Sequence, residues 1–158
     1  MLDVKDNEKE ALKAYLEELR SEYYEWYDRE KNRNRKWWRS LNFLIIGSSV
    51  ITTILAALQT SEISFIKSNL INIQIILILV PLAGTAASTV LMQTKTLELY
   101  KLREKGREEM QFLIDEGRRQ FAACKNDADF TKVHNFLLSE VRKIEQSQAS
   151  DFFASRKD

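Results

Sequence analysis

The stretch SLNFLIIGSSVITTILAALQTS, residues 40–61, and the stretch SNLINIQIILILVPLAGTAASTVLMQT, residues 68–94, contain no charged side chain. Because charged residues make up 30% of the chain, they are concentrated outside these two stretches. An uncharged apolar run of about 20 residues is long enough to cross a bilayer as a helix. Six residues separate the two stretches, so the pattern predicts a transmembrane hairpin, about 41–60 and 69–94, with a short outer loop.

A pair of buried core helices and a signal peptide both fit this pattern less well than a hairpin does. Buried helices of soluble domains are usually shorter and interrupted by charged residues. A signal peptide begins earlier and has a shorter apolar region than the stretch that starts near residue 41.

Lys and Arg flank the predicted hairpin on one side. Six of them lie in residues 29–40 and five in residues 95–107, whereas the loop has only Lys67. Positive residues are enriched on the cytoplasmic side, so we expect both termini in the cytoplasm. The basic cluster before the first helix is expected to attract anionic lipid headgroups rather than nucleic acid. The residues expected to anchor the helices at the cytoplasmic interface are Arg35, Trp37, Trp38, Arg39, Lys95 and Tyr100.

Outside the hairpin the sequence predicts further helices, and therefore an all-α membrane protein. No alternation of period two is long enough to indicate a strand. An apolar stripe with spacing 4, 3, 4, 3 predicts a helix that continues into the first membrane span. This apolar stripe consists of Leu12, Leu16, Leu19, Tyr23 and Trp26.

The second membrane helix is expected to run on beyond residue 94, with breaks at Gly117 and at residues 125–129. Asp127 or Asp129 is expected to cap a last helix, and the pattern is lost from Gln146 onward. The apolar stripe of that helix consists of Phe130, His134, Leu137, Val141 and Ile144.

We therefore predict three regions: a cytoplasmic amphipathic and basic helix over 1–40, the hairpin over 41–94 and a cytoplasmic helical region over 95–158. An amphipathic helix cannot bury its apolar face alone, so these helices are expected to form a bundle beneath the membrane. Because a two-helix hairpin has little interior, a homo-oligomer is expected.

Small and polar residues recur at a spacing of four in both membrane segments, a pattern that lets helix backbones approach closely. This pattern fits packing within the hairpin, and it also fits contacts between subunits around a pore. The candidate pore or packing residues are Ser49, Thr52, Thr53, Thr85, Ser88 and Thr89, next to faces that carry Ser48, Ala56, Ala57, Ala83, Gly84 and Ala87.

Several functional classes are not supported. Neither membrane segment contains the ionisable residue that ion-coupled transport usually needs. Walker, HExxH, CxxC and GxSxG motifs are missing, so we expect no enzyme and no cofactor. The single Cys124 excludes an intrachain disulfide, and with only one histidine, His134, a metal site has no support.

The layout resembles the bacterial SLATT superfamily of two-transmembrane effector domains, especially its stand-alone members of unknown function. The resemblance covers most of residues 23–144, although family members often carry a Trp shortly after the second membrane helix, where this chain has Leu97 to Tyr100. The matching residues are Trp26, Tyr27, Asp28, Asn32, Asn34 and Arg35 before the hairpin, and Tyr100, Arg103, Glu109, Phe112, Gly117 and Phe121 after it.

This resemblance implies a bacterial inner-membrane effector. In some relatives an associated sensor or nucleotide-synthesising enzyme is thought to trigger membrane permeabilisation, and here such a trigger would be a separate partner. We expect a pore-forming or membrane-perturbing effector. The alternative is a non-conducting scaffold or accessory subunit that binds a cytoplasmic protein partner through its charged helices.

Overall fold

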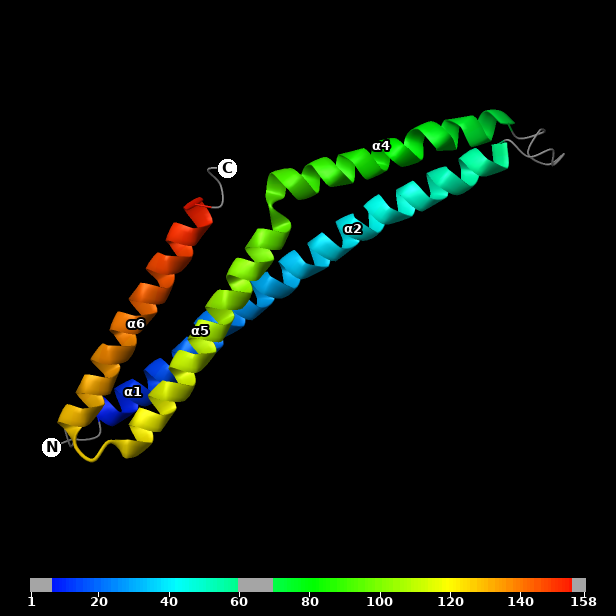
Figure 1. The fold of residues 1–158 in the computed structure, drawn as a ribbon. Coiled ribbons are helices and arrows are strands. Elements are labelled where there is room, and N and C mark those ends of the chain that lie inside the picture. Colours follow the sequence, from blue (N-terminus) through cyan, green and yellow to red (C-terminus); the bar gives the residue numbers. More distant parts are fainter. Residues whose placement is uncertain (1–6, 60–69, 155–158) are drawn as a thin grey trace. The chain divides into compact units, whose positions relative to one another are not determined.

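The computed structural model describes residues 7–59 and 70–154, and all regular secondary structure over these ranges is helical (Figure 1). The all-α prediction is therefore confirmed for the described residues. The predicted outer loop, with Lys67, lies outside them. The helices are α1 (Asn7–Glu18), the π-helical turn η2 (Leu19–Tyr24), α2 (Glu25–Gln59), α4 (Leu70–Thr94), α5 (Thr96–Ala123) and α6 (Asp127–Ala154).

The chain forms two compact units. Unit 1 consists of Met1–Arg33 and Glu98–Asp158, and unit 2 consists of Asn34–Leu97. The described parts of the two apolar stretches, residues 40–59 and 70–94, lie within unit 2. Unit 1 contains the amphipathic helices, as expected from the concentration of charge outside the apolar stretches.

Unit 1 is a helical bundle with one hydrophobic core. Leu137 is fully buried and Val141 is 4% exposed, so the predicted apolar stripe of the last helix packs inward. Each helix contributes one face, which is how amphipathic helices bury apolar area. The buried residues of this core are Leu12, Leu16, Leu19, Tyr27, Met110, Leu113, Ile114, Phe130, Val133, Leu137 and Val141.

The first apolar stripe changes its phase at η2. A regular α-helix returns to the same face after seven residues, which would place Trp26 inward after Leu19. The π-helical turn accommodates one extra residue, and Tyr27 is buried instead while Trp26 is 41% exposed. The predicted stripe is therefore correct up to Tyr23, which packs against the core, and wrong at Trp26, because the spacing rule assumes an uninterrupted α-helix.

Two expectations about the middle of the chain are also wrong. Gly117 lies inside α5 rather than at a break. A Cβ added to it would lie 2.8 Å from Leu16 Cδ2 and 3.0 Å from Leu137 Cδ2, so Gly117 lets three helices approach closely. Furthermore, the second apolar helix does not run on without interruption. Lys95 adopts a left-handed backbone conformation, with φ of 46°, between α4 and α5.

The last helix is capped by a residue other than the predicted Asp127 or Asp129. Asn126 Oδ1 accepts a hydrogen bond from the Asp129 N–H (2.9 Å), so Asn126 is the N-cap. The Asp129 carboxylate reaches back to the Lys125 N–H (3.1 Å), which resembles the reciprocal bond of a capping box. The pattern also does not end at Gln146, because α6 continues to Ala154 and Gln148 is 3% exposed.

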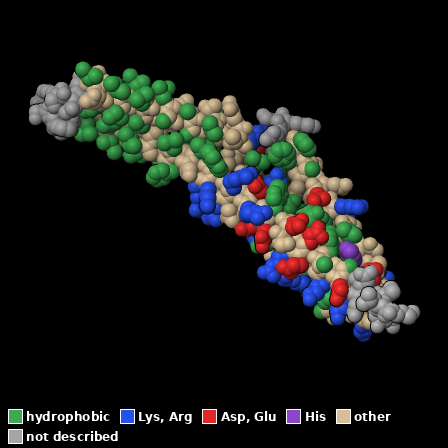
Figure 2. Space-filling view, turned by 180° about the vertical axis from the view of Figure 1, so that it is seen from behind, with side chains coloured by type: hydrophobic (Ala, Val, Ile, Leu, Met, Phe, Trp, Pro, Cys, Tyr) green, Lys and Arg blue, Asp and Glu red, His purple; other side chains and the backbone are tan. Residues whose placement is uncertain are grey.

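Two helices of the described residues are long and apolar enough to cross a membrane, and α4 and the apolar part of α2 lie in unit 2. Only 6% of the first apolar window and 11% of the second is buried within the molecule, unlike the core helices of soluble domains. Ser48 is buried against Gly84, where an added Cβ would clash with the Ser48 hydroxyl, and Ala87 is buried one turn further on. In Figure 2 hydrophobic side chains cover these helices, and charged side chains gather over the rest of the visible face.

The π-helical turn predicts an asymmetric response to single-residue deletions. Deletion of exposed Ser21 shortens the Leu19–Tyr27 separation to seven residues, so a regular α-helix still buries Tyr27. We expect the midpoint of thermal unfolding, measured by circular dichroism in mild detergent, to change by only a few degrees.

Deletion of exposed Ser139 is the control. It rotates Val141 out of the core and should reduce the stability by several kcal/mol. Equal destabilisation by both deletions would contradict the role given to η2.

Candidate functional site

Unit 1 contains a pocket of about 830 Å³ between the η2–α2 segment, α5 and the C-terminal part of α6. It follows directly from the phase change at η2, because Trp26 lines this pocket rather than filling the core. π-helical turns occur frequently at functional sites. The lining residues are Ser21, Glu22, Tyr23, Trp26, Tyr27, Arg29, Arg103, Glu145, Gln148, Ala149, Phe152 and Phe153.

Gly106 of α5 supports the base of the pocket. A Cβ added there would lie 2.6 Å from Tyr27 Cε1 and 3.0 Å from the amide carbon of Gln148. The phenol ring and the amide therefore pack against the glycine backbone, and both side chains are almost fully buried. Both amide atoms of Gln148 are shielded from solvent, and neither has a hydrogen-bond partner among the described residues.

The walls of the pocket are aromatic. The Trp26 ring packs edge-on against Tyr27, with ring centroids 4.9 Å apart, and the guanidinium of Arg103 lies 4.8 Å from the Trp26 centroid. Phe152 and Phe153 also meet edge-to-face. Burial and then the nearby Glu145 raise the pKa of Tyr23. Burial also raises the pKa of Tyr27, against an opposing effect of Arg103, so both phenols are neutral near pH 7.

Four charged side chains line the same pocket. They are Glu22, Arg29, Arg103 and Glu145, two of each sign. Across the part of the chain that the structure describes, none of the four belongs to an ion pair. The pocket therefore combines a buried amide, aromatic surfaces and two charges of each sign.

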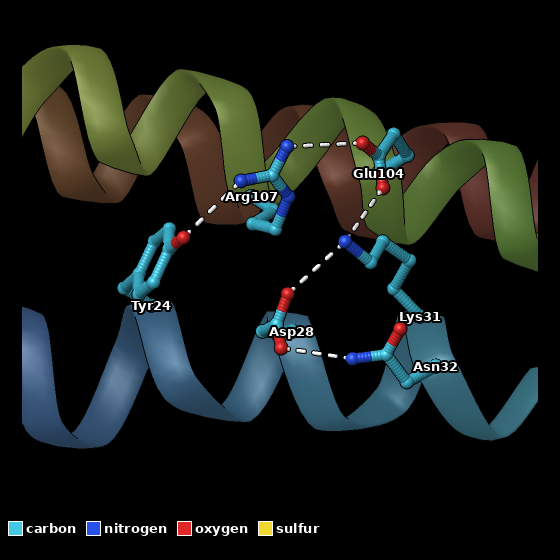
Figure 3. A network of polar contacts seen from close by, with 6 residues as sticks. All are labelled: Tyr24, Asp28, Lys31, Asn32, Glu104 and Arg107. Atoms are coloured by element: carbon cyan, nitrogen blue, oxygen red, sulfur yellow. Dashed lines mark hydrogen bonds and ion pairs between the residues drawn. The ribbon is translucent and has the colours of Figure 1, made fainter.

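A network of polar contacts links the adjacent turns of η2, α2 and α5 (Figure 3). Lys31 Nζ lies 3.0 Å from Asp28 Oδ1 and 3.2 Å from Glu104 Oε2. Arg107 donates to Glu104 Oε1 (3.0 Å) and to the Tyr24 hydroxyl (3.2 Å). Asn32 Nδ2 donates to the second oxygen of Asp28 (2.9 Å). This network connects two helices that are distant in sequence, and it contains Asp28 and Asn32, two residues of the SLATT resemblance.

The network changes the titration of its members. Burial alone would lower the pKa of Lys31, but hydrogen bonds to Asp28 and Glu104 outweigh it, and the pKa is raised. Burial would raise the pKa of Glu104, but hydrogen bonds from Arg107 and Lys31 lower it below 4.5. Both groups are therefore charged over the physiological range, which holds α2 and α5 together electrostatically.

The candidate pore or packing residues do not form the close contact within unit 2. Ser48 and Gly84 make it, and they precede Ser49 and Thr85 by one residue. Thr52 and Ser88 are half-buried, whereas the other four predicted residues are exposed. The threonine hydroxyls donate to the carbonyl four residues earlier on their own helices: Thr52 to Ser48, Thr53 to Ser49, Thr85 to Pro81 and Thr89 to Thr85, at 2.7–3.0 Å.

The predicted interface anchors fall in both units. Trp37 is 58% exposed, which suits an interfacial ring, and Trp38 is half-buried. Arg35 and Arg39 are exposed in α2, Lys95 is the left-handed residue between α4 and α5, and Tyr100 is half-buried in unit 1.

Neither Cys124 nor His134 has the surroundings of a catalytic group. The Cys124 thiol donates to the Gln120 carbonyl (3.2 Å), and burial, with a contribution from Asp129, raises its pKa. His134 is half-buried and packs on Tyr15 with ring centroids 5.0 Å apart. Among the described residues, no group of three or more His, Cys, Asp and Glu could hold a metal ion.

In comparisons with protein-family models, curated proteins and solved structures, nothing matches the chain. The assignment to the SLATT superfamily therefore stays a prediction. The site residues that sequence reasoning did not find are Gln148, Gly106, Glu22 and Glu145. Three residues that carried the resemblance, namely Trp26, Tyr27 and Arg103, do lie in the pocket.

The polar network predicts a pH-dependent effect of Glu104→Gln. Because its pKa is lowered on folding, the Glu104 carboxylate stabilises the fold at any pH above 4.5, the ordinary pKa of a glutamate. This contribution is lost as the pH falls through the folded-state pKa. We expect the variant to be less stable than the wild type at pH 7 by about 1–2 kcal/mol. The difference should shrink below pH 4.5, as measured by thermal unfolding in mild detergent.

Glu116→Gln is the matched control, because Glu116 pairs with Arg119 within one helix rather than across two. Its effect should be smaller, since exposed pairs within a helix contribute little. An equal loss in both variants, or a loss in Glu104→Gln that does not change between pH 7 and pH 3, would contradict the stabilising role of the network.

Proposed function

We propose that the chain is an integral membrane protein in which α4 and the apolar part of α2 form a transmembrane hairpin and unit 1 forms a cytoplasmic bundle. The observation that carries this proposal is the exposure of large apolar side chains on both helices of unit 2. Phe43 is 81% exposed and Ile71 73%. Contiguous apolar surface of this extent is rare on soluble monomers, and lipid would cover it.

We further infer that the protein assembles into a homo-oligomer and acts as a pore-forming or membrane-perturbing effector. Ser49, Thr53, Thr85 and Thr89 are exposed on the hairpin, beside the face that Ser48 and Gly84 use within the chain. Contacts with another hairpin or with water suit such polar faces better than lipid does. The SLATT resemblance supports the same role.

A specific observation favours the alternative, a non-conducting scaffold. The threonine hydroxyls already donate to carbonyls of their own helices. Satisfied hydroxyls can pack in a dry helix interface and do not need pore water. In this alternative, unit 1 would bind a cytoplasmic protein partner while the hairpin anchors the assembly.

The membrane topology is tested by cysteine labelling in intact bacterial cells. A Ser64→Cys variant in a Cys124→Ser background should react with a membrane-impermeant maleimide, because the loop is proposed to lie outside. An Asn135→Cys variant in the same background is the control, since residue 135 is exposed in α6 and proposed to be cytoplasmic. It should react only after permeabilisation, and labelling of it in intact cells would overturn the orientation.

The pore and the scaffold are distinguished by ion flux from liposomes that contain the purified oligomer. If the exposed threonines line a path, Thr53→Leu and Thr85→Leu should reduce the flux at least tenfold and leave the oligomer intact on size-exclusion chromatography. Ile54→Leu, a change on the exposed apolar surface, should leave the flux unchanged. Wild-type protein that conducts no ion, alone or with its native partner, would support the scaffold instead.

A further inference from the structure

The buried amide of Gln148 is the least satisfied group of the pocket. The side chain is 3% exposed, and its oxygen and nitrogen have no hydrogen-bond partner among the described residues. Leaving such a group unpaired costs about 1–3 kcal/mol. Native proteins contain few buried polar groups without a hydrogen-bond partner, and each of them requires a physical explanation. A ligand that pairs with the amide would recover this energy.

The shape of the amide narrows the class of ligand. A glutamine amide presents a donor N–H and an acceptor oxygen side by side. A lactam or amidine edge of a heterocycle offers the complementary acceptor and donor side by side, so it can pair with both atoms. The trans peptide bond holds its N–H and C=O on opposite sides and can pair with only one. An acyl chain pairs with neither.

The surroundings of the amide favour a planar and uncharged ligand. Trp26, Tyr27 and the two phenylalanines line the pocket with aromatic surface, which suits a planar ring that stacks or meets an edge; the Arg103 guanidinium covers one face of Trp26. The two arginines and two glutamates of the pocket have no net charge, so they do not favour a polyanion. Trp26 and Phe153 are well exposed, and as outer side chains they have room to move when a ligand approaches the shielded amide.

We propose that this pocket binds a neutral planar heterocycle with a lactam or amidine edge. The ring stacks on the aromatic walls, and its edge exchanges two hydrogen bonds with Gln148. The proposal concerns unit 1 alone, so it does not depend on whether the hairpin conducts ions.

The test uses the full chain in lipid nanodiscs with Trp37→Phe and Trp38→Phe, which leave Trp26 as the only tryptophan. The probe is lumichrome, a planar tricycle with a lactam edge that accepts energy from tryptophan. The matched probe is 1,3-dimethyllumichrome, which has the same ring but no N–H donor. Lumichrome should quench Trp26 emission in a saturable manner, with an affinity at least tenfold greater than that of the methylated probe.

Gln148→Met removes the amide and keeps the length of the side chain. We expect it to abolish the difference between the two probes and to keep or raise the midpoint of thermal unfolding, because no unpaired amide is then buried. Gln146→Met, at an exposed position of α6, should change neither quantity.

Three results would overturn the proposal. Equal affinities for the two probes in the wild type would mean that the pocket binds apolar molecules without distinguishing whether they carry N–H donors on their edge. No saturable quenching by lumichrome would mean that this class of ligand does not bind. A large fall in the unfolding midpoint of Gln148→Met would show that the amide is needed for the fold instead.

Discussion

The π-helical turn at Leu19–Tyr24 is the constraint on which the rest of unit 1 depends. It makes the separation between Leu19 and the next buried side chain, Tyr27, eight positions rather than seven. Tyr27 then packs on Gly106, and this close approach brings the η2–α2 segment and α5 together. Lys31, one turn further along α2, thereby lies within reach of Glu104 on α5. It pairs with both Asp28 and Glu104, and Glu104 in turn pairs with Arg107. Because Trp26 is displaced from the core, it becomes a wall of the pocket instead.

A second constraint acts on unit 2, where lipid would take the role that a protein core plays in unit 1. Its helices pack through small residues, with Ser48 against Gly84, and their large apolar side chains point away from each other. Helices in lipid gain little from burying apolar area against each other, so close packing of small residues becomes the dominant attraction. The same chain therefore uses opposite rules in its two units: large residues inside in unit 1, and small residues inside in unit 2.

Much of this architecture follows from local sequence patterns. The charge-free runs, the all-helical character and the buried face around Leu137 depend on composition and periodicity, which are local properties. The errors at Trp26, Gly117 and Gln146 have a different cause. An extra residue in a helix, a glycine used for close packing and a buried glutamine depend on neighbours that are distant in sequence. Gln148, for example, lies four residues after Ile144 and so continues the 4, 3, 4, 3 spacing of the stripe. Its polar side chain hid this continuation, and its contacts with Gly106 and its burial depend on neighbours distant in sequence.

The contrast between the pocket and the polar network also bears on function. Glu104 on α5 belongs to a network that lowers its pKa, whereas Arg103, its neighbour in sequence, pairs with no carboxylate of the described residues and lies over Trp26. The network thus pairs charges of α2 and α5, whereas the Arg103 guanidinium lies over Trp26 and the buried amide of Gln148 has no hydrogen-bond partner among the described residues. Proteins tolerate such local violations mainly at functional sites, where a ligand supplies the missing partner. If stability alone had shaped this surface, an apolar residue at position 148 would serve better than glutamine.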